Sequence, residues 1–277
     1  MSRILSLGYS PCPNDTFIFY ALAHGRVNLP GARVEERLED VETLNQLACR
    51  GLLDLTKISY HALGHLRDRY ALLRSGGALG RGCGPLVVAR SPLTMAELRD
   101  KTIAIPGRLT TANLLLQLHD QGYQNLAVMP FDLILDAVAQ GRVDAGVIIH
   151  ESRFTYAAKG LVAVEDLGAW WERATGLPIP LGGILARRDL GAELIRQADD
   201  AIRRSLAYAF AHPQEPRAYM RAHAQELAEP VMESHIALYV NEFSRDLGDE
   251  GEAAIRELFR RAEGRGLIPP CPLPLFG

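Results

Sequence analysis

Short apolar runs alternate with segments of helical periodicity along the first part of the chain. Strand-like runs at residues 4–7, 33–38 and 52–57 are each followed by a helix-like segment, at 17–23, 41–49 and 61–66. This alternation is typical of βαβ units. It predicts a mostly parallel sheet covered by helices.

A second series of the same kind follows a glycine-rich break at residues 75–82. Its predicted strands are 85–89, 102–105, 126–129 and 145–149, and its predicted helices are 111–119 and 132–140. Another break rich in Gly and Pro, at 176–183, precedes a short predicted strand at 184–186. We interpret the two breaks as crossings between two α/β lobes.

From residue 192 onward the chain has the pattern of packing helices. Apolar residues recur every four positions between Leu194 and Phe210 and form one stripe. We assign residues 1–87 and 186–277 to a discontinuous first lobe and residues 88–185 to a second. Two α/β lobes with two crossings are typical of a type II periplasmic-binding-protein-like clamshell, whose ligand site is the cleft between the lobes.

Composition and charge narrow the functional classes. The chain has 277 residues, 48% of them apolar, and 30 Lys+Arg against 33 Asp+Glu give a formal charge of -3. Such a balance provides no field that would attract nucleic acid or anionic lipid. No apolar run approaches the roughly 18 residues of a membrane span, and the first residues lack the apolar stretch of a secretory signal. We expect a cytoplasmic protein that binds neither nucleic acid nor membrane.

Motifs for metals, nucleotides and hydrolytic chemistry are missing from the sequence. The four cysteines lie far apart without a C-x-x-C pair or a histidine at ligand spacing, so neither a zinc site nor a disulfide is indicated. The chain has no phosphate loop and no G-x-G-x-x-G, G-x-S-x-G or H-E-x-x-H motif. We expect no metal and no cofactor.

The first candidate binding segment, residues 10–16, joins the first predicted strand to a helix. Ser10, Asn14 and Asp15 place several donors and acceptors in this short loop, at a sheet edge where ligands commonly bind. A capping turn with Asn14 or Asp15 as the helix N-cap explains the same residue types equally well.

Two further segments bring polar groups to strand ends or helix starts. Thr110 and Thr111 begin a predicted helix, where their hydroxyls and the free backbone N–H groups suit a substrate carboxylate, although the same pair could merely cap the helix. Lys57 and Ser59 fall at the carboxyl end of the third predicted strand and face the same cleft as the first loop. The alternative for Lys57 is a lysine whose stem packs on the surface beside a helix cap.

His150 is the best candidate for acid–base chemistry. It follows an apolar predicted strand, and its unperturbed pKa suits proton abstraction near neutral pH. The alternative is a hydrogen-bonded structural histidine. The other seven histidines have weaker surroundings, and four of them, His119, His212, His223 and His235, fall in predicted helices.

Five segments combine in a way that matches a known family. They are residues 10–19 (SPCPNDTFIF), 39–45 (EDVETLN), 75–80 (SGGALG), 149–156 (IHESRFTY) and 176–178 (GLP). Together they resemble the 1,4-dihydroxy-6-naphthoate synthase family of menaquinone biosynthesis by the futalosine pathway. The resemblance runs essentially end to end. It implies a clamshell-shaped carbon–carbon lyase that needs no cofactor and converts cyclic dehypoxanthinyl futalosine into 1,4-dihydroxy-6-naphthoate with release of dihydroxyacetone.

The resemblance also implies roles for particular residues. It places the proton-accepting histidine at His150 and the substrate-binding positions at Lys57, Ile58, Ser59, Thr110 and Thr111, with Ile58 contacting through its backbone. Glu151 and Arg153 are candidates for orienting the imidazole or holding a substrate oxygen. Because these positions come from both predicted lobes, we expect lobe closure about residues 84–90 and 182–187 to assemble the site around a small carboxylate substrate.

Two alternatives remain at this stage. One is a chorismate dehydratase of the same pathway, for which the segment 149–156 is atypical. The other is a non-catalytic solute-binding protein, which shares the clamshell but is expected to carry an export signal. Oligomeric state is not indicated by the sequence.

Overall fold

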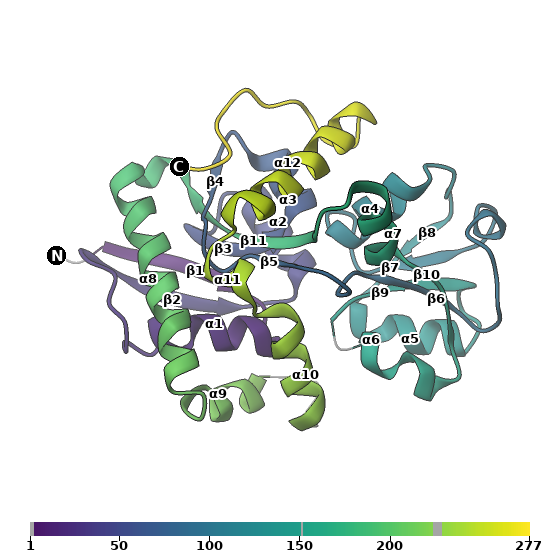
Figure 1. Cartoon of the computed structure of the whole chain (residues 1–277), viewed down its shortest axis with the longest axis horizontal. Coiled ribbons are helices and arrows are strands. Elements are labelled where there is room, and N and C mark those ends of the chain that lie inside the picture. The colour runs from purple at the N-terminus through teal and green to yellow at the C-terminus, as the bar shows by residue number, and fades with distance from the viewer. Residues whose placement is uncertain (1–2, 151, 224–228) are drawn as a thin grey trace.

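Two separate β-sheets, each covered by helices, make up the computed structural model, which describes residues 3–150, 152–223 and 229–277 (Figure 1). The first sheet has the order β2-β1-β3-β11-β4, and β5 pairs with β11. Its strands are β1 (Arg3–Tyr9), β2 (Ala32–Leu38), β3 (Leu55–Ser59), β4 (Tyr70–Leu72), β5 (Ala78–Gly80) and β11 (Ile179–Arg187). The helices around it are α1 (Pro13–Ala23), α2 (Val41–Cys49), α3 (Tyr60–Leu66), α8 (Ala192–Ala211), α9 (Glu215–His223), α10 (Glu229–Tyr239), α11 (Glu242–Arg245) and α12 (Gly248–Gly264).

The second sheet has the order β10-β6-β9-β7-β8. Its strands are β6 (Leu86–Ala89), β7 (Ile103–Ile105), β8 (Leu126–Val128), β9 (Ala145–Ile148) and β10 (Val162–Asp166). The helices around it are α4 (Thr111–His119), α5 (Phe131–Ala139), α6 (Ser152–Thr155) and α7 (Leu167–Thr175). Figure 1 shows this smaller body beside the larger one, with both termini on the larger.

The prediction of mostly parallel sheets is only partly right. Strands that follow a βα unit are parallel, as in β1 with β2 and β3, and β7 with β8 and β9. In contrast, β11 is antiparallel to β3, β4 and β5, and β6 is antiparallel to β9 and β10. Both of these strands begin after a crossing, so they enter their sheet from the side where their neighbours end.

The strand boundaries differ from those expected at both crossings. The predicted strand at 184–186 is the second part of the nine-residue β11, and β5, β10, α6 and α7 have no counterpart in the prediction. The predicted lobe boundaries, after residues 87 and 185, fall inside β6 and β11. The chain changes sheets between Gly80 and Leu86 and again between Asp166 and Ile179. We therefore propose lobe boundaries within those two segments.

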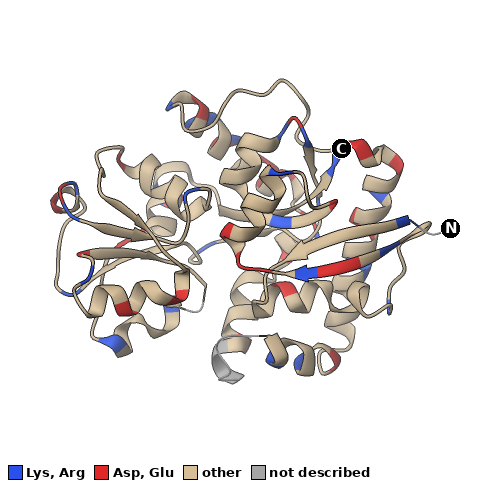
Figure 2. Cartoon of the chain, turned by 180° about the vertical axis from the view of Figure 1, so that it is seen from behind, with Lys and Arg blue, Asp and Glu red and all other residues tan. Residues whose placement is uncertain are grey.

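The burial of a strand depends on whether it lies inside its sheet or at the edge. All residues of β3, β6 and β9 are buried, because helices and neighbouring strands cover both faces. The edge strand β2 instead exposes Arg33, Glu35, Glu36 and Arg37, and such charges discourage pairing with another chain. Figure 2 shows basic and acidic residues interspersed over both sheets and their helices.

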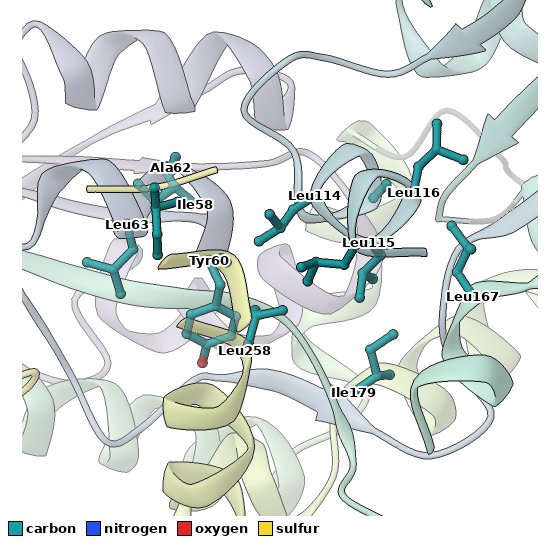
Figure 3. Packing of buried hydrophobic residues seen from close by; sticks show 14 of the residues in the cluster. Ile58, Tyr60, Ala62, Leu63, Leu114, Leu115, Leu116, Leu167, Ile179 and Leu258 are labelled. Carbon is teal, nitrogen blue, oxygen red and sulfur yellow. The ribbon is translucent and has the colours of Figure 1, made fainter. Parts of the chain in front are cut away.

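One apolar cluster runs from the first sheet into the second. It includes Tyr60 of α3, Leu258 of α12, Leu114 and Leu115 of α4 and Leu167 of α7, all fully buried (Figure 3). Two other clusters lie within single lobes, one around α1 and α8 and one around α5. The shared cluster joins the lobes on the side of α3, α4 and α12. Among the described residues, no helix is both long and apolar enough to cross a membrane.

Candidate active site

A cavity lies where β1, β3 and β9 end, between the two sheets. It contains about 720 Å³ of space between protein atoms, its open mouth included. Every predicted site residue except Arg153 lines it: Ser10, Asn14, Asp15, Lys57, Ile58, Ser59, Thr110, Thr111 and His150. These residues come from distant parts of the chain and line one cavity.

A buried ion pair forms part of the cavity wall. Lys57 Nζ lies 2.6 Å from Asp15 Oδ1, and each side chain is 6% exposed. Asp15 also accepts hydrogen bonds from the Ser10 hydroxyl at 2.7 Å and from the Asn14 amide at 2.7 Å. Within the described residues the Lys57 ammonium makes no further polar contact, so its other N–H groups are available to a ligand in the cavity.

The start of α1 differs from the predicted capping turn. Cys12, not Asn14 or Asp15, is the N-cap, and Pro13 occupies the first helical position. Proline is favoured there because it needs no N–H partner and its φ is already helical. The helix therefore begins early enough to place Asn14 and Asp15 in its first turn, where both line the cavity.

The end of β3 is held by the helix before it. Asn45 of α2 accepts a hydrogen bond from the Ser59 N–H at 3.1 Å and donates to the Ser59 hydroxyl at 3.3 Å. On the other side of β3, a Cβ on Gly182 would lie 2.8 Å from the Ile58 carbonyl oxygen. A glycine is therefore required for β11 to pair closely with β3 at this wall.

Both threonine hydroxyls at the start of α4 are used within the protein. Thr110 is the N-cap: its hydroxyl donates to the Gly107 carbonyl at 2.8 Å and accepts from the Asn113 N–H at 3.3 Å. The Thr111 hydroxyl donates to the Leu181 carbonyl at 2.6 Å. The groups left for an anion are backbone N–H groups of the first turn, which have no acceptor within the helix.

His150 has a left-handed backbone conformation, with φ 55°, and is the one such residue other than glycine among those described. That conformation is uncommon outside glycine and often accompanies function. His150 Nδ1 lies 3.6 Å from Cys12 Sγ, and the Phe131 ring lies 4.9 Å from the imidazole. The histidine of the second sheet thereby contacts the first loop of the first sheet.

Arg153 does not reach the cavity, which corrects its assignment to substrate binding. Its guanidinium donates to the Gly84 carbonyl and pairs with Asp166 at 2.8 Å. Arg153 thus ties α6 to β10 and to the first crossing. Glu151, the other candidate for orienting His150, lies outside the described residues.

Three residues of the cavity wall with polar or ionisable side chains were not among the predicted site residues: Cys83, His235 and Tyr239. The Tyr239 hydroxyl donates to the Cys83 carbonyl at 3.2 Å, and burial raises the pKa of the Cys83 thiol to about 12. His235 is 1% exposed. Burial, reinforced by the charges of His150 and Lys57, lowers its pKa to about 3. Glu233 and Ser234 directly precede His235 in the sequence, so no apolar run singles it out.

Within the part of the chain that the structure describes, no three His, Cys, Asp or Glu side chains are placed to hold a metal ion together.

Comparison with known sequences gives a consistent result. The model of a family described as menaquinone biosynthesis matches residues 5–264. A protein of Thermus thermophilus named 1,4-dihydroxy-6-naphthoate synthase is 63% identical over 273 residues, covering 98% of each chain. A Streptomyces coelicolor protein of the same name is 50% identical, covering 96% of this chain and 95% of the relative.

Solved structures share the arrangement of the two sheets. A crystal structure of an Archaeoglobus fulgidus protein is 39% identical, with a TM-score of 0.89 over 96% of this chain and 98% of that one. The aliphatic sulphonate binding protein of Escherichia coli, at 15% identity, has a TM-score of 0.66 over 98% of this chain and 90% of its own. The predicted α/β, periplasmic-binding-protein-like clamshell is therefore confirmed.

Proposed function

Because this chain belongs to the menaquinone biosynthesis family and is an enzyme of that process, we propose that it is a carbon–carbon lyase acting on cyclic dehypoxanthinyl futalosine. The products are 1,4-dihydroxy-6-naphthoate and dihydroxyacetone. Support comes from the names of two relatives at 63% and 50% identity and from a cavity that combines anion-binding groups with a histidine.

The substrate carboxylate binds at the start of α4 in this proposal. Thr110, Thr111 and Ala112 line the cavity, so the backbone N–H groups at the start of α4 lie at its wall, where the helix dipole adds partial positive charge. The Lys57 ammonium lines the same cavity and supplies a charge-assisted hydrogen bond. The threonine hydroxyls hold the helix start in place through Gly107 and Leu181.

His150 is the proposed general base, and its place in the cavity is the observation that carries the proposal. With the ring hydrogen on Nδ1, which lies 3.6 Å from the weak acceptor Cys12 Sγ, Nε2 is the nitrogen that accepts the proton. Nε2 then removes a proton from the substrate, the bond to the dihydroxyacetone carbons breaks, and the ring that remains becomes aromatic. The step uses neither a metal nor a cofactor.

Incubation with cyclic dehypoxanthinyl futalosine tests the activity directly, with the naphthoate product followed by absorbance. His150→Gln and His150→Asn should lower kcat by about 10² to 10⁴, the usual contribution of a general base, with little change in product affinity. Asn tolerates the left-handed backbone conformation of residue 150, so His150→Asn removes the imidazole without straining the backbone.

His119→Gln is the matched control, because His119 lies on α4 outside the cavity wall. Near-normal turnover in folded His150→Gln contradicts the assignment of the base. Loss of water from chorismate by the wild-type protein, with no naphthoate formed from the cyclic substrate, would support the dehydratase instead.

A further inference from the structure

His235 is a buried polar residue whose hydrogen bonds are unmade. It lies on α10, is 1% exposed and lines the cavity. Neither ring nitrogen has a hydrogen-bond partner among the described residues. Buried polar groups are nearly always hydrogen-bonded, so an imidazole with two unmet nitrogens in a cavity wall indicates a missing ligand group.

The position of His235 relative to the proposed base is well defined. The His235 and His150 ring centroids are 6.1 Å apart, with their planes inclined by 23°. His235 belongs to a C-terminal helix of the first lobe, whereas His150 follows a strand of the second sheet. A substrate group that reaches His150 therefore also comes near His235.

The wall behind His235 is fixed by its neighbours. The Tyr239 ring lies 4.6 Å from the His235 ring, one helical turn along α10, and the Tyr239 hydroxyl donates to the Cys83 carbonyl. Tyr239 therefore connects α10 to the first crossing. The imidazole is held in place by packing rather than by its own hydrogen bonds.

The chemistry of His235 differs from that of the carboxylate-binding groups. Its low pKa, about 3, keeps the ring neutral, so it offers one N–H donor and one acceptor nitrogen. A carboxylate, which only accepts, would leave the acceptor nitrogen unmet and would gain no charge pairing. A hydroxyl both donates and accepts, and a hydroxyketone presents hydroxyl and carbonyl oxygens together.

We propose that His235 binds an uncharged oxygen of the substrate, in the part that leaves as dihydroxyacetone, beside the proton acceptor His150. This inference rests on the proposed function. It divides the cavity into an anion-binding region formed by Lys57 and the start of α4 and a hydroxyl-binding region formed by His235.

Paired variants test the assignment. His235→Phe keeps an aromatic ring but removes both nitrogens, and His235→Asn keeps one donor and one acceptor. We expect kcat/KM for the cyclic substrate to fall about tenfold in the Phe variant and to recover most of that loss in the Asn variant. The Kd of 1,4-dihydroxy-6-naphthoate should stay within about twofold in both, because that product lacks the leaving group. His119→Phe serves as the control for replacing a histidine outside the cavity.

A measurement on the wild-type protein avoids dependence on the folding of a variant. In protein labelled with ¹⁵N-histidine, dihydroxyacetone added to the naphthoate complex should shift the His235 ring resonances, whereas those of His119 should stay in place. Unchanged His235 resonances overturn the inference.

The kinetic outcomes separate the two proposals. Product formation by the wild type together with an unchanged kcat/KM in folded His235→Phe overturns the inference alone. Equal losses in kcat/KM and in naphthoate affinity also overturn it, because His235 would then shape the cavity as a whole. Absence of naphthoate from the wild-type reaction overturns the proposed function and the inference with it.

Discussion

At the scale of single residues, the ion pair between Lys57 and Asp15 links ligand binding to folding. Both side chains are buried, so removing one charge leaves the other without compensation. Asp15→Asn should therefore lower the free energy of unfolding by about 3–5 kcal/mol. Urea denaturation of the variant and the wild type measures this difference.

The double variant Asp15→Asn with Lys57→Met supplies the control. Because it removes both charges, it should recover much of the stability lost in Asp15→Asn. It should bind the carboxylate product more weakly than the wild type does, because the Lys57 ammonium is absent. If the free energy of unfolding of Asp15→Asn lies within about 1 kcal/mol of the wild-type value, water compensates the charge of Lys57 in the native protein.

Which site residues can be found from sequence depends on where their partners lie. Lys57 lies within the apolar strand β3 and His150 follows the apolar strand β9, and that local pattern is enough to place both near the end of a strand. His235 has no such pattern, because a helical histidine contacts either core or cavity according to packing that is distant in sequence. Arg153 was misassigned because its partner, Asp166, ends a strand that the sequence pattern did not predict.

At the scale of elements, Thr110 controls the start of α4. Replacing it with Val removes the side-chain cap, which should lower stability by roughly 0.5–2 kcal/mol. The adjoining backbone N–H groups, which are the proposed carboxylate site, then become less ordered, so the KM should rise as well. Thermal unfolding and steady-state kinetics measure the two effects.

Thr110→Ser retains the capping oxygen and should behave like the wild type in both measurements. The double variant Thr110→Val with Thr111→Val also loses the bond to Leu181 and should weaken substrate binding further. An unchanged KM in that double variant would show that the two hydroxyls act only within the fold and do not order the substrate site.

A second element-scale prediction concerns pH and the contact between α3 and α4. The His61 ring nitrogen Nδ1 lies 3.2 Å from the Thr110 carbonyl, and burial, together with the charge of His65, lowers the His61 pKa to about 4. Between pH 6.5 and 4 the unfolded chain binds the proton more readily than the folded one. Stability contributed by neutral His61 is therefore complete above pH 6.5 and is lost as the pH falls toward 4.

His61→Asn isolates this contribution. On acidification from pH 7 to 4, the variant should lose less unfolding free energy than the wild type, by up to about 3 kcal/mol. Denaturant titrations at several pH values provide the comparison. Parallel losses in the two proteins would show that His61 takes up no proton on unfolding.

The elements themselves were predictable where local pattern and final environment agree. Segments such as α2 and α4 have an apolar face and end near their expected limits. The strand β10 contains Glu165 and Asp166 and is nowhere fully buried, so it lacks an apolar run. The direction of β6 and β11 depends on which sheet the chain enters after a crossing, and no local signal contains that information.

At the scale of the whole molecule, we expect the two lobes to close on a ligand, and the contacts between the lobes define the expected pivot. The Glu42 carboxylate of α2 accepts a hydrogen bond from the Leu109 N–H, before α4, at 3.3 Å. The apolar cluster shared by α3, α4 and α12 keeps the other side joined. We therefore expect closure to pivot about that cluster while the contact at Glu42 opens and re-forms.

Small-angle scattering with and without the naphthoate product tests this motion. A ligand that touches both lobes favours the closed state, so the radius of gyration should fall when the product binds. Glu42→Gln weakens the charge-assisted contact with Leu109 and should leave the free protein more open. Equal radii of gyration, together with superimposable free and bound crystal structures, would mean that the cavity is preformed.

The place of β11 between β3 and β4 has a consequence for the order in which the chain folds during synthesis. Every strand of the second sheet lies between residues 86 and 166, so that sheet can pair completely before β11 leaves the ribosome. The first sheet begins earlier but must wait for residues 179–187 to join its two parts. Until then β3 and β4 have open edges that can bind a chaperone or another nascent chain. The lobe whose synthesis starts first is thus the last to be completed.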